Sequence, residues 1–369
     1  MQKLLIINNQ TQFGYHIDSY KYCQYLGAEF DITYISQDKN LEKVSLPNVH
    51  AIYLAKEGNS LTHKIKFVKA VRNIIKEGSF DLFFIIYFRG SSLLRLATPS
   101  HATIIDVRTG CVHRNPYHRW FKDLLLRLEV FFYKEVSIIS TGLIKNLKLG
   151  YKKPHVIPLG SDIISHVDKL FTSFKLIYVG TFNNRHIDTT IAGFARFYEE
   201  YKDKISITYT IIGAGDPHEE KRIQETIKKY NLQEVVNFVG VVPHPQLHMY
   251  FDSHNIGVSF VPITKYFDCQ PPTKTFEYLL SGIPTIATNT SENNKLIDDN
   301  NGVLIEDNEK SFYKGLVKLY EHRHFFKSSD IRQNALSHTW KGIVHSNLRQ
   351  YLNKISGKRS KPSVFKSTI

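Results

Sequence analysis

Cysteine is scarce in this chain, and its spacing argues against two ways of stabilising a small domain. Only Cys23, Cys111 and Cys269 occur, and no two of them form a CxxC pair. An odd number of scattered thiols is not typical of a disulfide framework or a zinc site. His244 and His248 have the spacing of a helical zinc pair, but no third ligand lies near them. We therefore expect a reducing cytoplasm and no metal site.

Long hydrophobic runs are also missing. The longest, Leu82 to Phe88, stops at Arg89 and is far shorter than the roughly 20 residues that span a bilayer. After Lys3 the N-terminus has only four consecutive apolar residues, too few for the core of a signal peptide. We expect a soluble or peripheral protein, in the cytoplasm or on the inner face of the cell membrane.

Acidic residues are outnumbered. The chain has 34 Asp and Glu against 48 Lys and Arg, a formal net charge of +14. Such an excess favours an anionic partner, which leaves a nucleic acid, an anionic membrane surface or an anionic small substrate. No zinc-finger spacing, RNP signature or basic heptad region supports nucleic acid, so none is expected. A basic surface without a specific partner remains an alternative.

The pattern that is present is an alternation of short apolar runs with helical periodicity, over a length of 369 residues that suits two domains. It predicts an α/β protein with two Rossmann-like domains, at 1–160 and 174–330, joined by a linker at 161–173. A helix over 331–356 is expected to cross back to the first domain. The basic segment 357–369 is expected to be a disordered tail.

The first domain opens with a strand, a loop and a helix but lacks GxGxxG, so no dinucleotide fingerprint is present. In the second domain the expected strands are 176–179, 206–212, 235–239, 256–261, 285–288 and 303–305.

One stretch, Cys269 to Thr288, has the pattern of a loop, a helix and a buried strand. Pro272 ends the loop, Thr273 is expected to cap the helix, and Gly282 ends it. A helix start presents free N–H groups and a positive dipole end, so it favours an anion, phosphate above all.

Two side chains add to this anion site. Lys274 places a full positive charge at the helix start. Glu277 follows one turn along the same face, where it could accept hydrogen bonds from sugar hydroxyls. Phosphate beside a hydroxylated sugar describes a nucleotide or a nucleotide-sugar.

Three further strand ends carry glycine, at Gly180, Gly213 and Gly240. Arg185 follows the first of them and could bind phosphate through two hydrogen bonds. Each glycine alone is explained equally well by a tight turn. Since the carboxyl ends of parallel strands share one edge of a sheet, together they predict a ligand site there.

Together these motifs resemble the donor half of glycosyltransferase family 4, a family with the GT-B fold. The resemblance covers about residues 174–322. It rests on Gly180–Arg185, Gly213-Ala-Gly215, Phe238-Val-Gly240 and Pro272-x-Lys274-x-x-Glu277-Tyr-Leu-x-x-Gly282-x-Pro284-x-Ile286-Ala-Thr. The first domain resembles the family only in its β/α rhythm.

The resemblance implies a GT-B protein in which two Rossmann-like β/α/β domains face a central cleft. It also implies that Glu277 holds the nucleotide ribose and that Arg185 and Lys274 bind the diphosphate. Thr273 would offer its backbone N–H, and the Val241 region would flank the base. The implied donor-binding residues are Gly180, Thr181, Arg185, Gly213, Val241, Thr273, Lys274 and Glu277.

The family glutamate that touches the donor sugar would fall at Cys269, and a thiol cannot accept hydrogen bonds as a carboxylate does. Asp268 or Gln270 could substitute, with a different sugar specificity. No D-x-D pair suits a metal, so Arg185, Lys274 and the helix start would neutralise the leaving group. We expect the nucleotide-sugar as co-substrate and no cofactor.

Candidate acceptor residues lie in the first domain. Asp106 follows a strand and could orient or deprotonate the acceptor hydroxyl, while Arg108 could bind an acceptor phosphate. A structural Asp–Arg pair at a turn is the alternative. Gly14 and His16 lie on another loop of the same edge. The predicted catalytic residues are Arg185, Lys274, Glu277 and Asp106.

Two basic amphipathic helices are expected, at 61–76 and at 119–134. Such helices can lie on an anionic membrane, but helices that cover a Rossmann sheet have the same pattern. For 61–76 the two interpretations are equal. For 119–134, whose stripe is rich in aromatic residues, core packing is favoured.

The predicted function is that of a retaining glycosyltransferase, which moves a hexose-type sugar to a hydroxyl of a glycan acceptor. The acceptor is expected to be lipid-linked, in cell-surface polysaccharide biosynthesis. Two alternatives stay open: a nucleotide-sugar epimerase of the same fold, and a catalytically inactive membrane-associated GT-B scaffold. Cys269, in place of the family glutamate, is the feature that keeps the second open.

Overall fold

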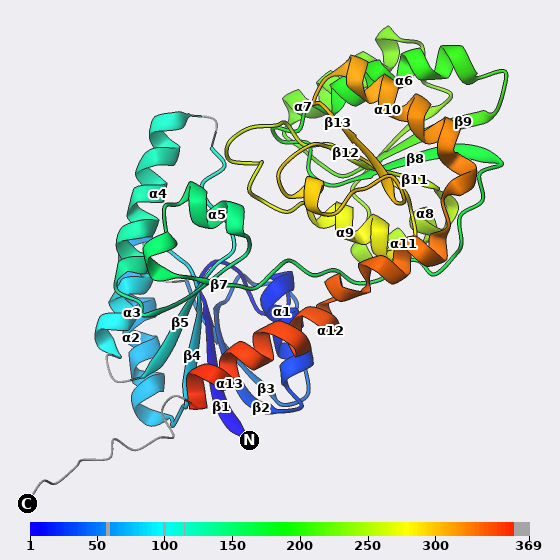
Figure 1. Cartoon of the computed structure of the whole chain (residues 1–369). Coiled ribbons are helices and arrows are strands. Elements are labelled where there is room, and N and C mark those ends of the chain that lie inside the picture. Colours follow the sequence, from blue (N-terminus) through cyan, green and yellow to red (C-terminus); the bar gives the residue numbers. More distant parts are fainter. Residues whose placement is uncertain (57–59, 99–100, 114, 358–369) are drawn as a thin grey trace, which may run out of the picture. The chain divides into compact units, whose positions relative to one another are not determined.

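The computed structural model describes residues 1–56, 60–98, 101–113 and 115–357, so the predicted tail beyond Gly357 lies outside the described residues. The chain forms two compact units (Figure 1). Unit 1 contains Met1–Leu159 and the chain from Trp340 onward, and unit 2 contains Gly160–Thr339.

Unit 1 is built on a parallel sheet with the strand order β3-β2-β1-β4-β5-β6-β7. Its strands are β1 (Gln2–Asn8), β2 (Phe30–Gln37), β3 (Val49–Leu54), β4 (Leu82–Ile86), β5 (Ala102–Val107), β6 (Glu135–Ile138) and β7 (His155–Val156). The central strands are continuous apolar runs because helices cover both faces of such a sheet.

The helices of unit 1 come from both ends of its sequence. They are α1 (Ile17–Leu26), α2 (Ser60–Glu77), α3 (Ser91–Ala97), α4 (Pro116–Phe131), α5 (Thr141–Asn146), α12 (Trp340–Ile343) and α13 (Arg349–Gly357). Trp340 is buried, and its ring packs edge-on against Tyr22 of α1 at 6.1 Å. The C-terminal segment therefore completes the core of unit 1.

Unit 2 has a second parallel sheet with the order β10-β9-β8-β11-β12-β13. Its strands are β8 (Ser173–Val179), β9 (Ser206–Ile212), β10 (Val236–Gly240), β11 (Ile256–Ser259), β12 (Thr285–Thr288) and β13 (Gly302–Ile305). The helices are α6 (Ile187–Tyr201), α7 (Pro217–Lys229), α8 (Leu247–Ser253), α9 (Thr273–Leu280), α10 (Glu309–His322) and α11 (Ser328–Ala335). The prediction of two Rossmann-like domains is confirmed.

The prediction of one continuous helix over 331–356 is wrong. Helix α11 ends at Ala335, and the backbone of Thr339 is extended before a new helix begins at Trp340. The cause is a tertiary contact: Ser161 donates its N–H to the carbonyl of His338 at 2.9 Å and forms a bridge with Thr339. Helical periodicity in the sequence does not reveal such a contact.

The interpretation of the stripe on 119–134 as core packing is also wrong for most of its length. Among the residues of α4, only Leu126 and Val130 are buried. The aromatic side chains Trp120, Phe121 and Phe131 are about half exposed or more. The helix thus covers unit 1 with a narrow face and leaves a wide apolar face outside.

Three strand ends of unit 2 are joined by backbone hydrogen bonds. Gly180 donates its N–H to the carbonyl of Ile212 at 3.0 Å, and Gly213 donates to that of Gly240 at 2.8 Å. Gly213 has a φ of +145°, and a Cβ there would lie 1.8 Å from the carbonyl oxygen of Gly180. Only glycine permits this approach of the β8 and β9 ends.

Substitution of Gly213 is expected to be far more costly than substitution of a matched glycine. Gly240 also has a positive φ, +81°, but no atom lies within 4 Å of its Cβ position. Gly240→Ala should lower the free energy of unfolding by about 1 kcal/mol, and Gly213→Ala by roughly 3 kcal/mol. Urea denaturation measures both, and equal losses would contradict the close approach.

Candidate active site

The candidate site lies where the strand order of unit 2 reverses, between β8 and β11. Ligands of open parallel sheets bind outside the carboxyl ends of the strands at such a point. The loop after β8 begins with Gly180, and α9 follows β11. A Cβ on Gly180 would lie 3.0 Å from the Nζ of Lys274, so the glycine leaves room for the lysine and the two elements meet here.

The start of α9 is open toward a ligand. Pro272 occupies the N-cap position and makes no side-chain cap, so the prediction that Thr273 caps the helix is wrong. Thr273 is the first helical residue and is exposed. Because proline has no side-chain acceptor for the first N–H groups, these groups and the positive dipole end can bind an anion.

Buried polar side chains hold this helix start in place. The hydroxyl of Thr275 donates to Asn293 at 2.9 Å and lies 2.7 Å from the hydroxyl of Ser259. The side-chain amide of Asn293 in turn donates to the carbonyl of Thr288 at 2.9 Å. The first turn of α9 is thereby fixed against the ends of β11 and β12.

Lys274 is the central cation of the site. Its side chain is 9% exposed, and its Nζ donates to the hydroxyl of Tyr178 at 3.1 Å, 4.2 Å from the ring centroid. Burial, with a smaller contribution from Arg185, lowers the pKa of Lys274 to about 7, while Glu277 opposes the change. The burial therefore disfavours the charged form of the amine, and a nearby anion would favour it.

Arg185 lies on the loop after β8. Its guanidinium is 4.0 Å from the ring centroid of Phe267, and burial lowers its pKa. The stacking fixes the plane of the guanidinium, which helps it to form paired hydrogen bonds with phosphate. Phe267 is a site residue that the sequence did not indicate, because nothing local marks a turn aromatic as a partner of Arg185.

Glu277 stands one turn beyond Lys274, with 13% of its side chain exposed. Burial raises its pKa to about 7, Lys274 lowers it and Asp162 raises it further. Its Oε1 lies 4.0 Å from the Nε2 of His244. The sequence indicates His244 only as half of a helical zinc pair and does not reveal its position beside this carboxylate. His248 lies 2.7 Å from the carbonyl oxygen of Pro245. The described part of the chain holds no group of three or more His, Cys, Asp and Glu residues suited to a metal.

The residues around Cys269 point to other partners. The buried thiol is 3.8 Å from the carbonyls of Lys265 and Tyr266. Both carboxylate oxygens of Asp268 accept hydrogen bonds from Ser291, at 2.7 and 2.6 Å. Gln270 donates to the carbonyl of Tyr266 at 3.0 Å. Both predicted substitutes are therefore already engaged in hydrogen bonds, and the donor-sugar contact stays a prediction.

The remaining donor-side residues lie at the same sheet edge. Thr181 is exposed, and its carbonyl accepts a hydrogen bond from Tyr178 at 2.7 Å. Val241 directly follows the end of β10 and is exposed. The structure thus brings Gly180, Gly213, Lys274 and Glu277 into one neighbourhood, while the roles assigned to them stay predictions.

The predicted acceptor residues of unit 1 are more deeply placed. Asp106 is fully buried, accepts from Ser137 at 2.7 Å, and has its pKa raised to about 6 by burial. Arg108 donates to Asp18 at 2.6 Å and to the carbonyl of Ile157 at 2.7 Å. Arg108 therefore holds Asp18 at the start of α1, and its Nε lies 3.9 Å from Asp106, a contact that fits a structural Asp–Arg pair. The acceptor roles of both residues stay predictions.

The other two acceptor candidates lie at that same helix start. His16 is the N-cap residue of α1, and its Nδ1 accepts from the N–H of Ser19 at 3.3 Å. Burial lowers its pKa. Gly14 lies in the preceding loop against Val44. His16 therefore has a capping role in addition to any contact with a ligand.

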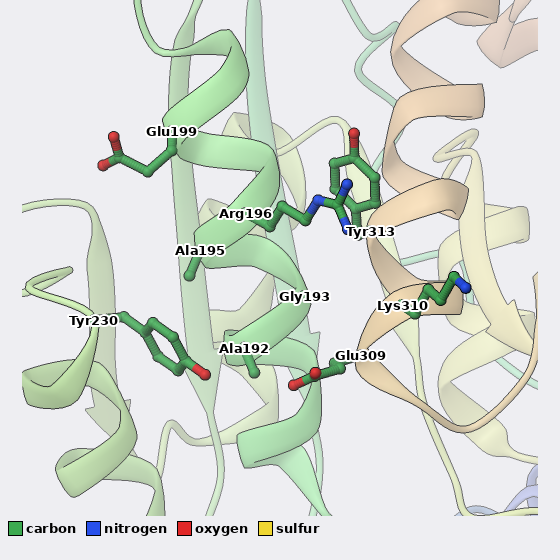
Figure 2. A pocket seen from close by; sticks show the side chains of 9 residues that line it. All are labelled: Ala192, Gly193, Ala195, Arg196, Glu199, Tyr230, Glu309, Lys310 and Tyr313. Carbon is green, nitrogen blue, oxygen red and sulfur yellow. The ribbon is translucent and has the colours of Figure 1, made fainter.

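A separate hollow of about 440 Å³ lies between α6 and α10 of unit 2 (Figure 2). Figure 2 shows Arg196 beside the ring of Tyr313, and the guanidinium carbon is 4.1 Å from the ring centroid. Its lining residues are Ala192, Gly193, Ala195, Arg196, Glu199, Tyr230, Glu309, Lys310 and Tyr313. None of the predicted site residues is among them, so this hollow offers control positions.

The region that holds this site is similar to a known protein family. Residues 173–322 match the family described as "Glycosyl transferases group 1". This segment lies within unit 2 and is similar to the group 1 glycosyl transferases. The match includes every donor-side residue discussed above. No curated protein matches the chain in sequence.

Solved structures extend the likeness to the whole chain. Sucrose-phosphate synthase from Thermosynechococcus elongatus has a TM-score of 0.79 at 16% identity, over 97% of this chain and 100% of that one. Anabaena Alr3699/HepE, in complex with UDP and glucose, has a TM-score of 0.72 at 12% identity, over 96% of this chain and 100% of that one. The lipopolysaccharide outer core galactosyltransferase WaaB has a TM-score of 0.71 at 15% identity, over 97% of this chain and 100% of that one.

At these identities the likeness establishes the fold, and the predicted GT-B fold is confirmed. Together the domain match and the fold support a glycosyltransferase.

The burial of Lys274 predicts that binding of a diphosphate takes up a proton. At pH 8 the free lysine, with a pKa of about 7, is largely neutral, and a bound diphosphate should raise that pKa. Affinity should therefore be flat below about pH 7 and fall by up to about tenfold per pH unit above it. Calorimetry in buffers of different ionisation enthalpy measures the uptake.

The measurement is made on the Glu277→Gln variant, because this substitution removes the second group of the site with a pKa of about 7. Lys274→Arg in the same background is the matched control, because arginine stays charged. At pH 8 we expect about one proton to be taken up per diphosphate bound. This uptake should disappear in the Lys274→Arg variant. The same uptake with lysine and arginine would contradict the assignment.

Proposed function

We propose that the chain is a retaining glycosyltransferase of family 4, which transfers a hexose-type sugar from a nucleotide-sugar to a hydroxyl of a glycan acceptor. The observation that carries the proposal is the uncapped start of α9, with buried Lys274 beside Gly180 and Glu277 one turn along. The group 1 family match covers all of these residues. The likeness to HepE, whose structure holds UDP and glucose, adds support for a nucleotide-sugar donor.

In this proposal the diphosphate of the donor lies against the N-terminus of α9. Lys274 and Arg185 neutralise the negative charge that develops on the leaving nucleotide. Because both cations are partly shielded from water, each interacts with phosphate more strongly than a surface lysine would. Glu277 accepts hydrogen bonds from the ribose hydroxyls, and Val241 flanks the base.

The proposal assigns no step to a metal ion. Two cations and the helix dipole supply positive charge on the diphosphate. Transfer that is unchanged when a chelator is added is the corresponding expectation. The sugar end of the donor is assigned to the turn that contains Cys269, with Asp268 and Gln270 as the two side chains to test.

For the acceptor we propose a lipid-linked glycan at the inner face of the cell membrane, in cell-surface polysaccharide biosynthesis. Support comes from the net charge of +14 and from the likeness to WaaB, a lipopolysaccharide outer core galactosyltransferase. Unit 1 is the proposed acceptor side. There Arg108 acts as a positioning residue, because it donates a hydrogen bond to Asp18 at the start of α1. Asp106, which is buried and accepts a hydrogen bond from Ser137, lies 3.9 Å from Arg108 and supports it.

Substitutions at the two central residues should weaken nucleotide binding. Lys274→Met removes a charge-assisted hydrogen bond to phosphate, and Glu277→Ala removes the ribose acceptor. Each loss should cost about 1.5–3 kcal/mol, roughly 10- to 100-fold in affinity for a nucleoside diphosphate. Lys310→Met, in the hollow of Figure 2, removes the same charge and should leave affinity unchanged. A panel of nucleoside diphosphates is measured by calorimetry and thermal shift.

The assignment is wrong if Lys274→Met and Glu277→Ala bind every nucleoside diphosphate as the unaltered chain does. Incubation with donor alone separates the alternatives. Formation of an isomeric nucleotide-sugar without acceptor would indicate an epimerase. Binding without hydrolysis or transfer would indicate an inactive scaffold.

A further inference from the structure

Helix α4 has two apolar faces, and only one of them packs on unit 1. Successive residues of a helix are rotated by about 100°, which places buried Leu126 and Val130 on one side. The opposite side holds Tyr117, Trp120, Phe121, Leu128 and Phe131, with exposed fractions of 48–83%. A helix that covers a sheet needs only one apolar stripe, so the second stripe requires another partner.

The exposed apolar surface continues on the neighbouring helices. Helix α3 contacts both α2 and α4, and the three lie along one side of unit 1 (Figure 1). Ile65 of α2 and Leu93 and Leu96 of α3 are about half exposed. They line a groove of about 510 Å³ together with basic side chains of α2: the lining residues are Ile65, Val68, Lys69, Arg72, Leu93 and Leu96.

Positive charge accompanies this surface. Residues 60–134 contain thirteen Lys and Arg but only five Asp and Glu, so this fifth of the chain carries +8 of the net +14. One of the thirteen, Arg108, is buried and paired with Asp18. Most of the carboxylates in this segment are turned toward the protein. Asp123 accepts from the N–H of Cys111, Glu129 accepts from the N–H groups at the start of α3, and Asp106 is fully buried.

A cation also stands at the C-terminal end of the stripe. The ammonium of Lys152 lies 5.2 Å from the ring centroid of Phe131 and donates to the carbonyls of Phe131 and Tyr133. An apolar stripe bordered by lysine and arginine matches the interface of an anionic bilayer, where rings reach the acyl chains and cations meet phosphates. A second copy of this chain would instead bring two positive surfaces together.

We propose that the surface formed by α4, α3 and the basic face of α2, here called the α4 surface, binds an anionic lipid membrane. Helix α4 is about 24 Å long at 1.5 Å per residue and lies in the plane of the interface. No helix in the described part of the chain is long and apolar enough to cross a membrane. This surface would bring the enzyme to the membrane that holds the proposed acceptor. Only that biological role, and not the membrane binding itself, rests on the proposed function.

The test uses the full chain and vesicles of phosphatidylcholine with or without phosphatidylglycerol. The chain has only two tryptophans, Trp120, which is 61% exposed, and Trp340, which is 2% exposed. Binding to phosphatidylglycerol vesicles should therefore shift the emission of Trp120 to the blue and allow its quenching by brominated lipid, over a constant contribution from Trp340. Co-sedimentation gives the affinity.

The double variant Trp120→Ser/Phe131→Ser should bind these vesicles at least about tenfold more weakly, because two rings no longer enter the interface. The control Met249→Ser/Phe325→Ser removes two exposed apolar side chains of unit 2 and should bind as the unaltered chain does. Lys69→Glu/Arg72→Glu should remove most of the dependence on phosphatidylglycerol and on salt. Urea denaturation checks that each variant is folded.

Three results would overturn the proposal: no more binding with phosphatidylglycerol than without it, full binding by Trp120→Ser/Phe131→Ser, or vesicle-independent dimers that this variant abolishes. Sedimentation velocity detects the dimers. Vesicle binding needs no donor, and nucleoside diphosphate affinity needs no membrane. Failure of the α4 surface and failure of the proposed sugar transfer are therefore distinguishable.

Discussion

The close backbone approach at Gly213 is the constraint on which the donor-side geometry depends. Because no Cβ separates Gly213 from the carbonyl of Gly180, the ends of β8 and β9 meet, and β10 joins them through Gly240. The loop that carries Arg185 starts from this junction. Gly180 also leaves the space that the Lys274 ammonium occupies. A small change in backbone bulk at the junction would therefore displace both proposed phosphate-binding cations.

The burial of Lys274 links the charge of the site to ligand binding. Lys274 is buried, and its pKa falls to about 7 because burial penalises the charged form. In the proposed function a diphosphate supplies negative charge that stabilises the charged amine. Glu277 behaves in the opposite sense, with a pKa raised to about 7 by the same burial. The pair gives the site a charge state that depends on its occupant.

Local patterns in the sequence predicted the strands well, and features that depend on tertiary contacts were missed. Strands 206–212 and 285–288 were predicted with the bounds observed for β9 and β12, because their apolar runs end at clear breakers. The break near Thr339 depends on Ser161, which is remote in sequence. Periodicity located the aromatic stripe of α4 and favoured it as the packed side, whereas Leu126 and Val130 are the residues that are buried. In the site, glycine positions and Lys274 carried local signals, whereas Phe267 and His244 approach it from turns that no spacing rule links to it.

The most direct measurement is a crystal structure of the chain with a nucleoside diphosphate, collected at a pH below 7 so that Lys274 is charged. The account predicts phosphate oxygens within hydrogen-bond distance of the Lys274 ammonium and of the first N–H groups of α9, with the ribose hydroxyls on Glu277. A nucleotide bound in the hollow between α6 and α10, or one whose phosphates avoid the start of α9, would contradict it.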